Sequence, residues 1–176
     1  MKKGALELRP LKLEDERSFM EAVAEFQRET PPWEFALGFD NFTSFADYVR
    51  GVNGWPQGEN LPAGHVPSGF YVGIVDGEVI GRVSIRFRLN EFLRQIGGHI
   101  GYGVRRSWRR RGYATEMLRQ ALPICAGNGI KQALVTCDVD NLGSIKVIER
   151  CGGVFESLTS APELKVQKCR YWLKTQ

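Results

Sequence analysis

The chain has 176 residues, of which 43% are hydrophobic and 25% charged, a composition that is typical of a soluble globular protein and excludes a disordered or fibrous one. This length fits one domain spanning residues 1–176. The formal net charge is only +4, but five arginines fall between Arg105 and Arg111, and this local excess favours an anionic ligand: a phosphorylated small molecule, a nucleic acid or a membrane surface.

Strands are predicted where apolar residues alternate with polar ones, and helices where apolar residues recur every three or four positions. In chain order the predicted elements are a strand at 5–11, helices at 14–29 and 44–52, strands at 69–75, 78–87 and 97–104, a helix at 114–127, a strand at 132–137, a helix at 142–150, and strands at 154–158 and 166–173. A long surface loop is expected at 51–68.

Two details refine this pattern. Asp76-Gly77 is a strong hairpin signal between the second and third strands. Pro123 inside the helix at 114–127 predicts a kink or a local break. Three antiparallel strands followed by strand–helix–strand crossings predict an α/β (α+β-like) domain, with a single mixed, mostly antiparallel sheet and helices on both faces.

Sequence features also bear on location and metals. Residues 1–15 lack the apolar run of a signal peptide, and no later stretch is as long and apolar as a membrane-spanning helix. The four cysteines form no CxxC pair, and two histidines are too few for a recognisable zinc pattern. We therefore expect a cytoplasmic protein with reduced thiols, no metal and no membrane association.

The run Arg109-Arg110-Arg111-Gly112-Tyr113-Ala114 lies between a predicted strand and a predicted helix. The first N–H groups of a helix have no partner inside the helix, and the helix dipole makes that end positive. A glycine there lets the backbone approach a ligand closely, and arginines add phosphate contacts. This corner therefore has the residue types that a diphosphate site needs.

Three other interpretations of the corner stay open at this stage. It could be a solvated basic turn with no ligand. A nucleotide-binding loop is less favoured, because neither GxGxxG nor GxxxxGK[ST] occurs. A nucleic-acid surface would need basic and aromatic residues spread over a broad face, whereas these arginines lie in one short segment.

The segment 104–115, VRRSWRRRGYAT, resembles the [QR]xxGx[GA] signature of the GNAT superfamily of acetyl-CoA-dependent N-acetyltransferases, with Arg109, Gly112 and Ala114 at the defining positions. Residues 89–118 and 136–153 are similar to the "predicted acetyltransferase" group within that superfamily. The order of predicted elements is also the GNAT order, so the resemblance covers the whole chain. It implies a GNAT fold whose sheet is splayed between the fourth and fifth main strands.

The resemblance also implies a set of residues that bind acetyl-CoA, the expected co-substrate. Backbone amides of the corner would hold the pyrophosphate, and pantetheine would bond to the strand before it. Asn141 and Ser144 match an Asn and a small residue that open a later helix, although Asn141 is equally explained as a helix cap. The implied cofactor-binding residues are Tyr102, Val104, Arg109, Arg110, Arg111, Gly112, Tyr113, Ala114, Thr115, Asn141 and Ser144.

The catalytic groups are less clear because the family's usual proton-donating tyrosine is replaced by Ile148. Two candidates remain: His99, whose ordinary pKa suits a general base, and Tyr102, whose backbone N–H could stabilise an oxyanion. Strand alternation puts His99 on the face opposite Tyr102, which favours a core or supporting histidine. Trp33, Trp55 and the loop 51–68 are expected to shape the acceptor site.

Together these features predict an N-acetyltransferase that moves an acetyl group to a primary amine of a small molecule or peptide by direct attack. Because Ile148 cannot donate a proton, a non-catalytic CoA-binding sensor or regulatory domain is the alternative, and a nucleic-acid-binding module is the third hypothesis. The expected partners are acetyl-CoA and an amine acceptor, without nucleic acid or membrane, and the expected state is a monomer or homodimer.

Overall fold

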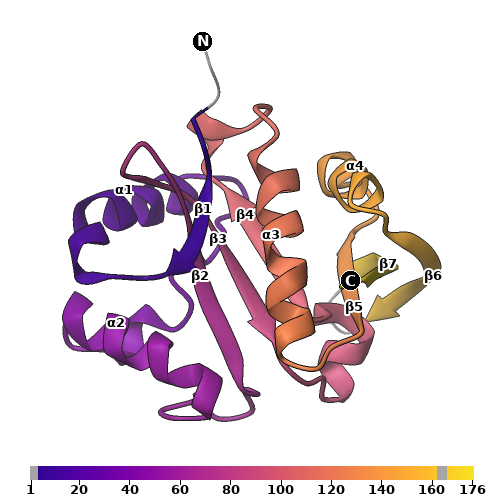
Figure 1. The fold of residues 1–176 in the computed structure, drawn as a ribbon, viewed down its shortest axis with the longest axis horizontal. Coiled ribbons are helices and arrows are strands. Elements are labelled where there is room, and N and C mark those ends of the chain that lie inside the picture. Colours follow the sequence, from indigo (N-terminus) through magenta and orange to yellow (C-terminus); the bar gives the residue numbers. More distant parts are fainter. Residues whose placement is uncertain (1–3, 162–165) are drawn as a thin grey trace.

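The computed structural model describes residues 4–161 and 166–176. Seven strands and four main helices alternate along these residues (Figure 1). The strands are β1 (Glu7–Pro10), β2 (Ser68–Val75), β3 (Glu78–Arg86), β4 (Ile100–Val104), β5 (Gln132–Asp138), β6 (Val154–Ala161) and β7 (Val166–Lys174). The helices are α1 (Glu16–Gln27), α2 (Phe45–Gly54), α3 (Tyr113–Gly127) and α4 (Leu142–Arg150).

The strands form two antiparallel sheets, in the orders β1-β2-β3-β4 and β5-β7-β6. The predicted fold class is confirmed, and the predicted position of the splay, between the fourth and fifth main strands, is where the two ladders separate. The separation goes further than the single mixed sheet that we expected. At the start of β4 the N–H of His99 still donates to the carbonyl of Leu134 in β5 at 2.6 Å, but no regular ladder follows, so β4 and β5 diverge along their lengths.

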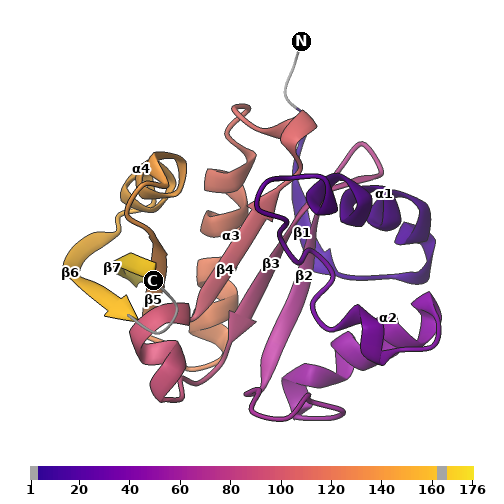
Figure 2. The ribbon, with the colours of Figure 1, turned by 180° about the vertical axis from the view of Figure 1, so that it is seen from behind.

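Helices cover both faces of the larger sheet. Helices α1 and α2 lie over one face, and α3 lies over the other (Figures 1 and 2). Each face carries its own core: aromatic residues of α1 and α2 pack on β2, and apolar residues of α3 pack on β3, β4 and β5. Alternation along β3 follows from this arrangement, because Val83 and Ile85 face the α3 core while Arg82 and Arg86 point toward α1.

The structure differs from two local expectations. Helix α3 is continuous through Pro123, so the local break is absent. Pro123 and Arg119, whose carbonyl loses its helical partner, are both exposed, so water can satisfy that carbonyl. Residues 53 and 54, expected only in the loop, complete α2. Glycine is needed at position 51 inside that helix because a side chain there would collide with the ring of Phe42.

Candidate active site

A cleft of about 640 Å³ lies between the end of β4, the corner before α3, and α4. The end of α1 and the residues that follow it form a further wall, which includes Phe26, Glu29 and Trp33. Ten of the eleven residues predicted to bind the cofactor line it: Tyr102, Val104, Arg109, Arg110, Gly112, Tyr113, Ala114, Thr115, Asn141 and Ser144. The fold therefore brings together residues from segments far apart in the sequence, and of the predicted set only Arg111 is not among the lining residues.

The backbone of the corner is shaped to surround an anion. Arg110 and Gly112 both have left-handed conformations, with φ of 61° and 79°, and such alternation turns successive N–H groups toward one point. Apart from Tyr113, the residues from Arg110 to Thr115 donate no backbone hydrogen bond to any described residue. These donors adjoin the positive end of α3, so the corner offers fixed dipoles to a phosphate group.

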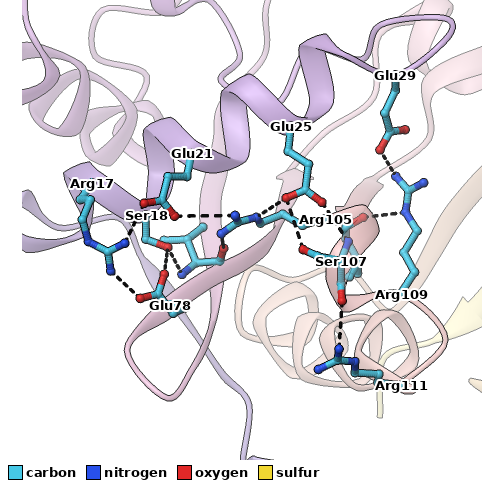
Figure 3. Close-up of polar contacts among 12 residues, drawn as sticks. Arg17, Ser18, Glu21, Glu25, Glu29, Glu78, Arg105, Ser107, Arg109 and Arg111 are labelled. Carbon is cyan, nitrogen blue, oxygen red and sulfur yellow. Dashed lines mark hydrogen bonds and ion pairs between the residues drawn. The ribbon is translucent and has the colours of Figure 1, made fainter.

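The arginine side chains of the corner have different roles. Arg109 is tied into the protein: its Nε donates to the Val104 carbonyl at 2.8 Å and its Nη2 pairs with Glu29 at 2.6 Å (Figure 3). Arg111 donates to the Ser107 carbonyl at 3.1 Å. Arg110 lines the cleft and makes no hydrogen bond or ion pair with the described residues, so its charge is available to a ligand.

Two cations at the cleft were missed from the sequence. Lys146 and Arg150, one helical turn apart on α4, both line it, and neither pairs with a carboxylate in the part of the chain that the structure describes. Their spacing of four residues on the face that also carries Gly143 and Val147 was the available signal. With Arg110 they give this end of the cleft a positive potential.

Asn141 acts as the cap of α4. Its side-chain oxygen accepts a hydrogen bond from the Ser144 N–H at 3.0 Å. The helix therefore begins beside the cleft with its cap satisfied by this chain. Of the two explanations left open by the sequence, the structural cap is the one whose contact is present.

Strand β4 presents free backbone to the cleft. Arg86 N–H donates to the His99 carbonyl, and Arg105 N–H donates to the Ile80 carbonyl. Antiparallel alternation between these two bonds turns the N–H and C=O of Tyr102 away from β3 and toward the space left by the splay. The Tyr102 side chain also lines the cleft, where its hydroxyl donates a long hydrogen bond of 3.5 Å to the Ser144 carbonyl.

The comparisons with known proteins agree with this geometry. A family model described as an acetyltransferase (GNAT) domain matches residues 5–154. The chain belongs to the GNAT acetyltransferase family. A comparison with curated protein sequences found no match.

Solved GNAT structures share the fold. RimJ of Mycobacterium smegmatis, in complex with CoA-disulfide, has a TM-score of 0.71 at 22% identity over 97% of this chain and 82% of that chain. RimL, a ribosomal L7/L12 α-N-protein acetyltransferase in complex with coenzyme A, has a TM-score of 0.67 at 20% identity, covering 96% and 93% of the two chains. A GNAT-family acetyltransferase from Streptococcus pneumoniae gives 0.64 at 15% identity, covering 97% and 99%.

His99 is not placed as a catalytic base of this GNAT domain. It does not line the cleft, and its Nδ1 accepts a hydrogen bond from the Leu134 N–H at 2.9 Å. Burial, together with the nearby cations Arg86 and Arg94, lowers the pKa of His99 to about 4. A histidine with this pKa is a weak base, so our expectation of a catalytic His99 is corrected to a bridging role between β4 and β5.

Three other residues singled out from the sequence lie in different surroundings. Ile148, at the position of the usual tyrosine, is fully buried in the core with α3 and β5. Trp33 lines the cleft as expected, but Trp55 is buried against Phe70 and does not line it. Sequence reasoning failed for Trp55 because it begins a 3-10 turn, Trp55–Gln57, that packs into the core instead of lying in a surface loop.

Within residues 4–161 and 166–176, no group of three or more His, Cys, Asp or Glu side chains is arranged to hold a metal ion. None of the helices in those ranges has the length and apolar character needed to cross a membrane.

Proposed function

We propose that this GNAT domain transfers an acetyl group from acetyl-CoA to a primary amine by direct attack on the thioester. The observation that carries the proposal is the set of backbone N–H groups without a described partner at Arg110, Arg111, Gly112, Ala114 and Thr115, adjoining the free edge of β4 in one cleft. Two structures with the same fold, RimJ and RimL, are complexes with CoA-disulfide and CoA, which supports CoA as the ligand.

The cofactor would be bound at two points. The pyrophosphate would accept hydrogen bonds from the corner amides, with Arg110 adding a charge-assisted contact and with Lys146 and Arg150 attracting the phosphates. The pantetheine arm would follow the unpaired edge of β4, where Tyr102 N–H and C=O are available. Both contacts use backbone geometry, which does not depend on side-chain ordering.

The chemistry follows from this position. A neutral amine attacks the thioester carbon, a C–N bond forms, and the Tyr102 N–H stabilises the oxyanion of the tetrahedral intermediate. The intermediate then collapses, the C–S bond breaks, and the CoA thiolate leaves while the nitrogen loses its proton to water.

Tyr102 would assist the leaving group as a hydrogen-bond donor. Burial raises the pKa of Tyr102 above its ordinary value, so its phenol keeps its proton and is a poorer acid than a thiol. Proton transfer to the thiolate would be uphill, but a hydrogen bond from the phenol still stabilises the developing negative charge. Water then supplies the proton that ends on CoA.

A non-catalytic CoA sensor is the second candidate, favoured by the burial of Ile148 where a proton-donating tyrosine usually stands. The two functions differ in turnover.

We also propose a cytoplasmic location, supported by the four free thiols Cys125, Cys137, Cys151 and Cys169. The oligomeric state, monomer or homodimer, stays a prediction.

The test is an acetyl-transfer assay that follows release of the CoA thiol with a chromogenic disulfide, over a panel of amino acids, polyamines, aminoglycosides and peptides with free N-termini. We expect thiol release that depends on at least one amine, with the N-acetyl product confirmed by mass. CoA binding measured by calorimetry without acetylation of any amine would overturn the enzyme and support the sensor.

A further inference from the structure

Two arginines lie beside β4, on the face of the larger sheet that α1 covers, and Arg82 is buried whereas Arg86 is half-buried. Arg82 is 3% exposed. Its guanidinium donates to the carbonyls of Phe35 and Glu34 and to the Ser84 hydroxyl at 3.0–3.1 Å, and it lies 4.1 Å from the centre of the Trp33 ring. Arg82 is therefore fully hydrogen-bonded, but its charge is met by no carboxylate in a salt bridge among the described residues.

Arg86 lies two residues further along the same face and has far fewer contacts. Its single hydrogen bond in the described structure is a long one, from Nη1 to the Gly97 carbonyl at 3.4 Å. Among the described residues, two buried side-chain polar atoms lack a hydrogen-bond partner: Tyr48 Oη and Trp55 Nε1. No Arg86 nitrogen is one of them. The unpartnered nitrogens of Arg86 are therefore accessible, and they can donate to a bound group.

Other arginines of this domain show what a paired guanidinium looks like. Arg105 is paired with Glu25 at 2.8 Å, and Arg109 with Glu29 at 2.6 Å. A cation taken out of water without such a partner is costly. Burial accordingly lowers the pKa of Arg86, and burial with the neighbouring Arg86 lowers that of Arg82 to about 9. The Glu34 carboxylate acts on Arg82 through space, whereas burial alone accounts for the shift of Arg86, so Arg86 is the cation left for a ligand to neutralise.

The position of this pair relates it to the thioester. A side chain at Gly101 would touch the Arg86 guanidinium, and one at Gly103 would collide with the Trp33 ring. The two glycines thus let the Arg86 guanidinium and the Trp33 ring pack directly against the backbone of β4. Gly101 is adjacent to Tyr102, about 3.3 Å along the strand. If an acceptor binds to Arg86 through one group and presents its amine to the thioester at Tyr102, only a few bonds separate that group from the amine.

We propose that Arg86, supported by Arg82, binds a carboxylate of the acceptor and that the acceptor is an amine carrying a carboxylate a few bonds away. This inference rests on the proposed acetyl transfer and names its substrate class. Two sources share that chemistry: a free amino acid, and a peptide whose N-terminal residue is acidic.

The test compares kcat/KM for matched acceptors that differ in one charge: alanine with alaninamide, and the dipeptide amides Asp-Ala and Asn-Ala. The wild-type domain is expected to prefer the charged member of one pair by roughly 10-fold or more, mainly through KM, as for a charge-assisted guanidinium contact. The pair that shows the preference distinguishes a free amino acid from an acidic N-terminus.

Variants assign the preference to Arg86. Arg86→Gln is expected to remove the preference, by lowering kcat/KM for the charged member more than for the neutral one, and Arg86→Lys to keep part of it. Arg88→Gln, which removes an exposed charge two residues away, is the matched control and should keep it. CoA titration verifies that each variant is folded.

Three outcomes would overturn the proposal. Equal kcat/KM within both pairs for the wild type, with acetylation and CoA binding intact, contradicts the carboxylate site and leaves acetyl transfer standing. A preference that survives Arg86→Gln contradicts the role of Arg86. Failure of the wild type to acetylate any amine while it binds CoA refutes acetyl transfer itself, and the acceptor assignment with it.

Discussion

His99 is the residue at which the two sheets still touch. Its backbone N–H and its ring Nδ1 both bond to Leu134, while its carbonyl accepts from Arg86. Because Nδ1 must keep its lone pair to accept, the ring is neutral in the folded protein. Protonation breaks this bond in a buried site next to two cations, which explains why the pKa of His99 falls to about 4.

This pKa gives a stability prediction with a definite sign. Between about pH 6.5 and pH 4 the unfolded chain binds a proton at His99 and the folded chain does not, so the free energy of unfolding falls as the solution is acidified. The loss from His99 between pH 7 and pH 5 is about 2 kcal/mol. Urea unfolding followed by circular dichroism at the two pH values measures it.

The variant His99→Asn is the comparison, since its amide oxygen is an acceptor that does not titrate. Its free energy of unfolding should fall less between pH 7 and pH 5 than that of the wild type, by about 2 kcal/mol. Equal pH dependence in the two proteins would show that His99 titrates normally in the folded state and would remove the bridging role.

At the scale of elements, α1 and the residues that follow it hold the corner in place through an acidic ridge, Glu21, Glu25 and Glu29, in which Glu29 lies just beyond the end of the helix (Figure 3). Glu25 accepts from Arg105 Nε and from the Ser107 N–H, each at 2.8 Å. Burial alone would raise the pKa of Glu25, but these hydrogen bonds outweigh it and the pKa falls below its usual value. The acidic ridge thus fixes the segment that leads from β4 into the corner.

We predict that Glu25→Gln lowers the free energy of unfolding by about 1 to 2 kcal/mol, because it weakens two charge-assisted hydrogen bonds in a partly buried site. It should also weaken CoA binding several-fold, because the corner amides lose their fixed orientation. Calorimetry and urea unfolding measure the two effects.

The matched control for that variant is Glu16→Gln, on the exposed first turn of the same helix. It should change CoA affinity little. If Glu25→Gln and Glu16→Gln bind CoA equally tightly, the acidic ridge does not order the corner and serves stability alone.

The helices, the strands and the corner were predictable from the sequence because each depends on residues that are close together along the chain. The spacing of Phe19, Ala22 and Phe26 predicts α1, and Gly112 beside a helix start predicts the anion corner. The partners of the corner arginines were not predictable, since Arg109 and Glu29 are 80 residues apart in sequence. The same limit hid Arg86, whose unpaired state depends on every neighbouring segment.

At the scale of the whole molecule, the cleft lies beside the free edge of β4, between the corner and α4, while residues of both sheets share one core with α3. The element order was enough to predict the fold class and the place of the splay. It could not predict the complete separation of the ladders, because that depends on how the π-helical turn Leu93–Gly97 and Gly98, with φ of 64°, direct the chain into β4. A ligand in the cleft would contact β4, the corner and α4 together, and would thereby stabilise the folded state.

The central claim is that the corner around Gly112 binds the pyrophosphate of CoA, and calorimetric titration with CoA tests it most directly. Gly112→Val would strain a residue with φ of 79° and would crowd the corner. Gly129→Val is the matched control, because it imposes the same strain at φ of 78° in open space outside the cleft. We predict one CoA per wild-type chain, a roughly tenfold or greater loss of affinity in Gly112→Val, and wild-type affinity in Gly129→Val. No CoA binding by the wild type, or equal affinity in the wild type and both variants, would contradict the account.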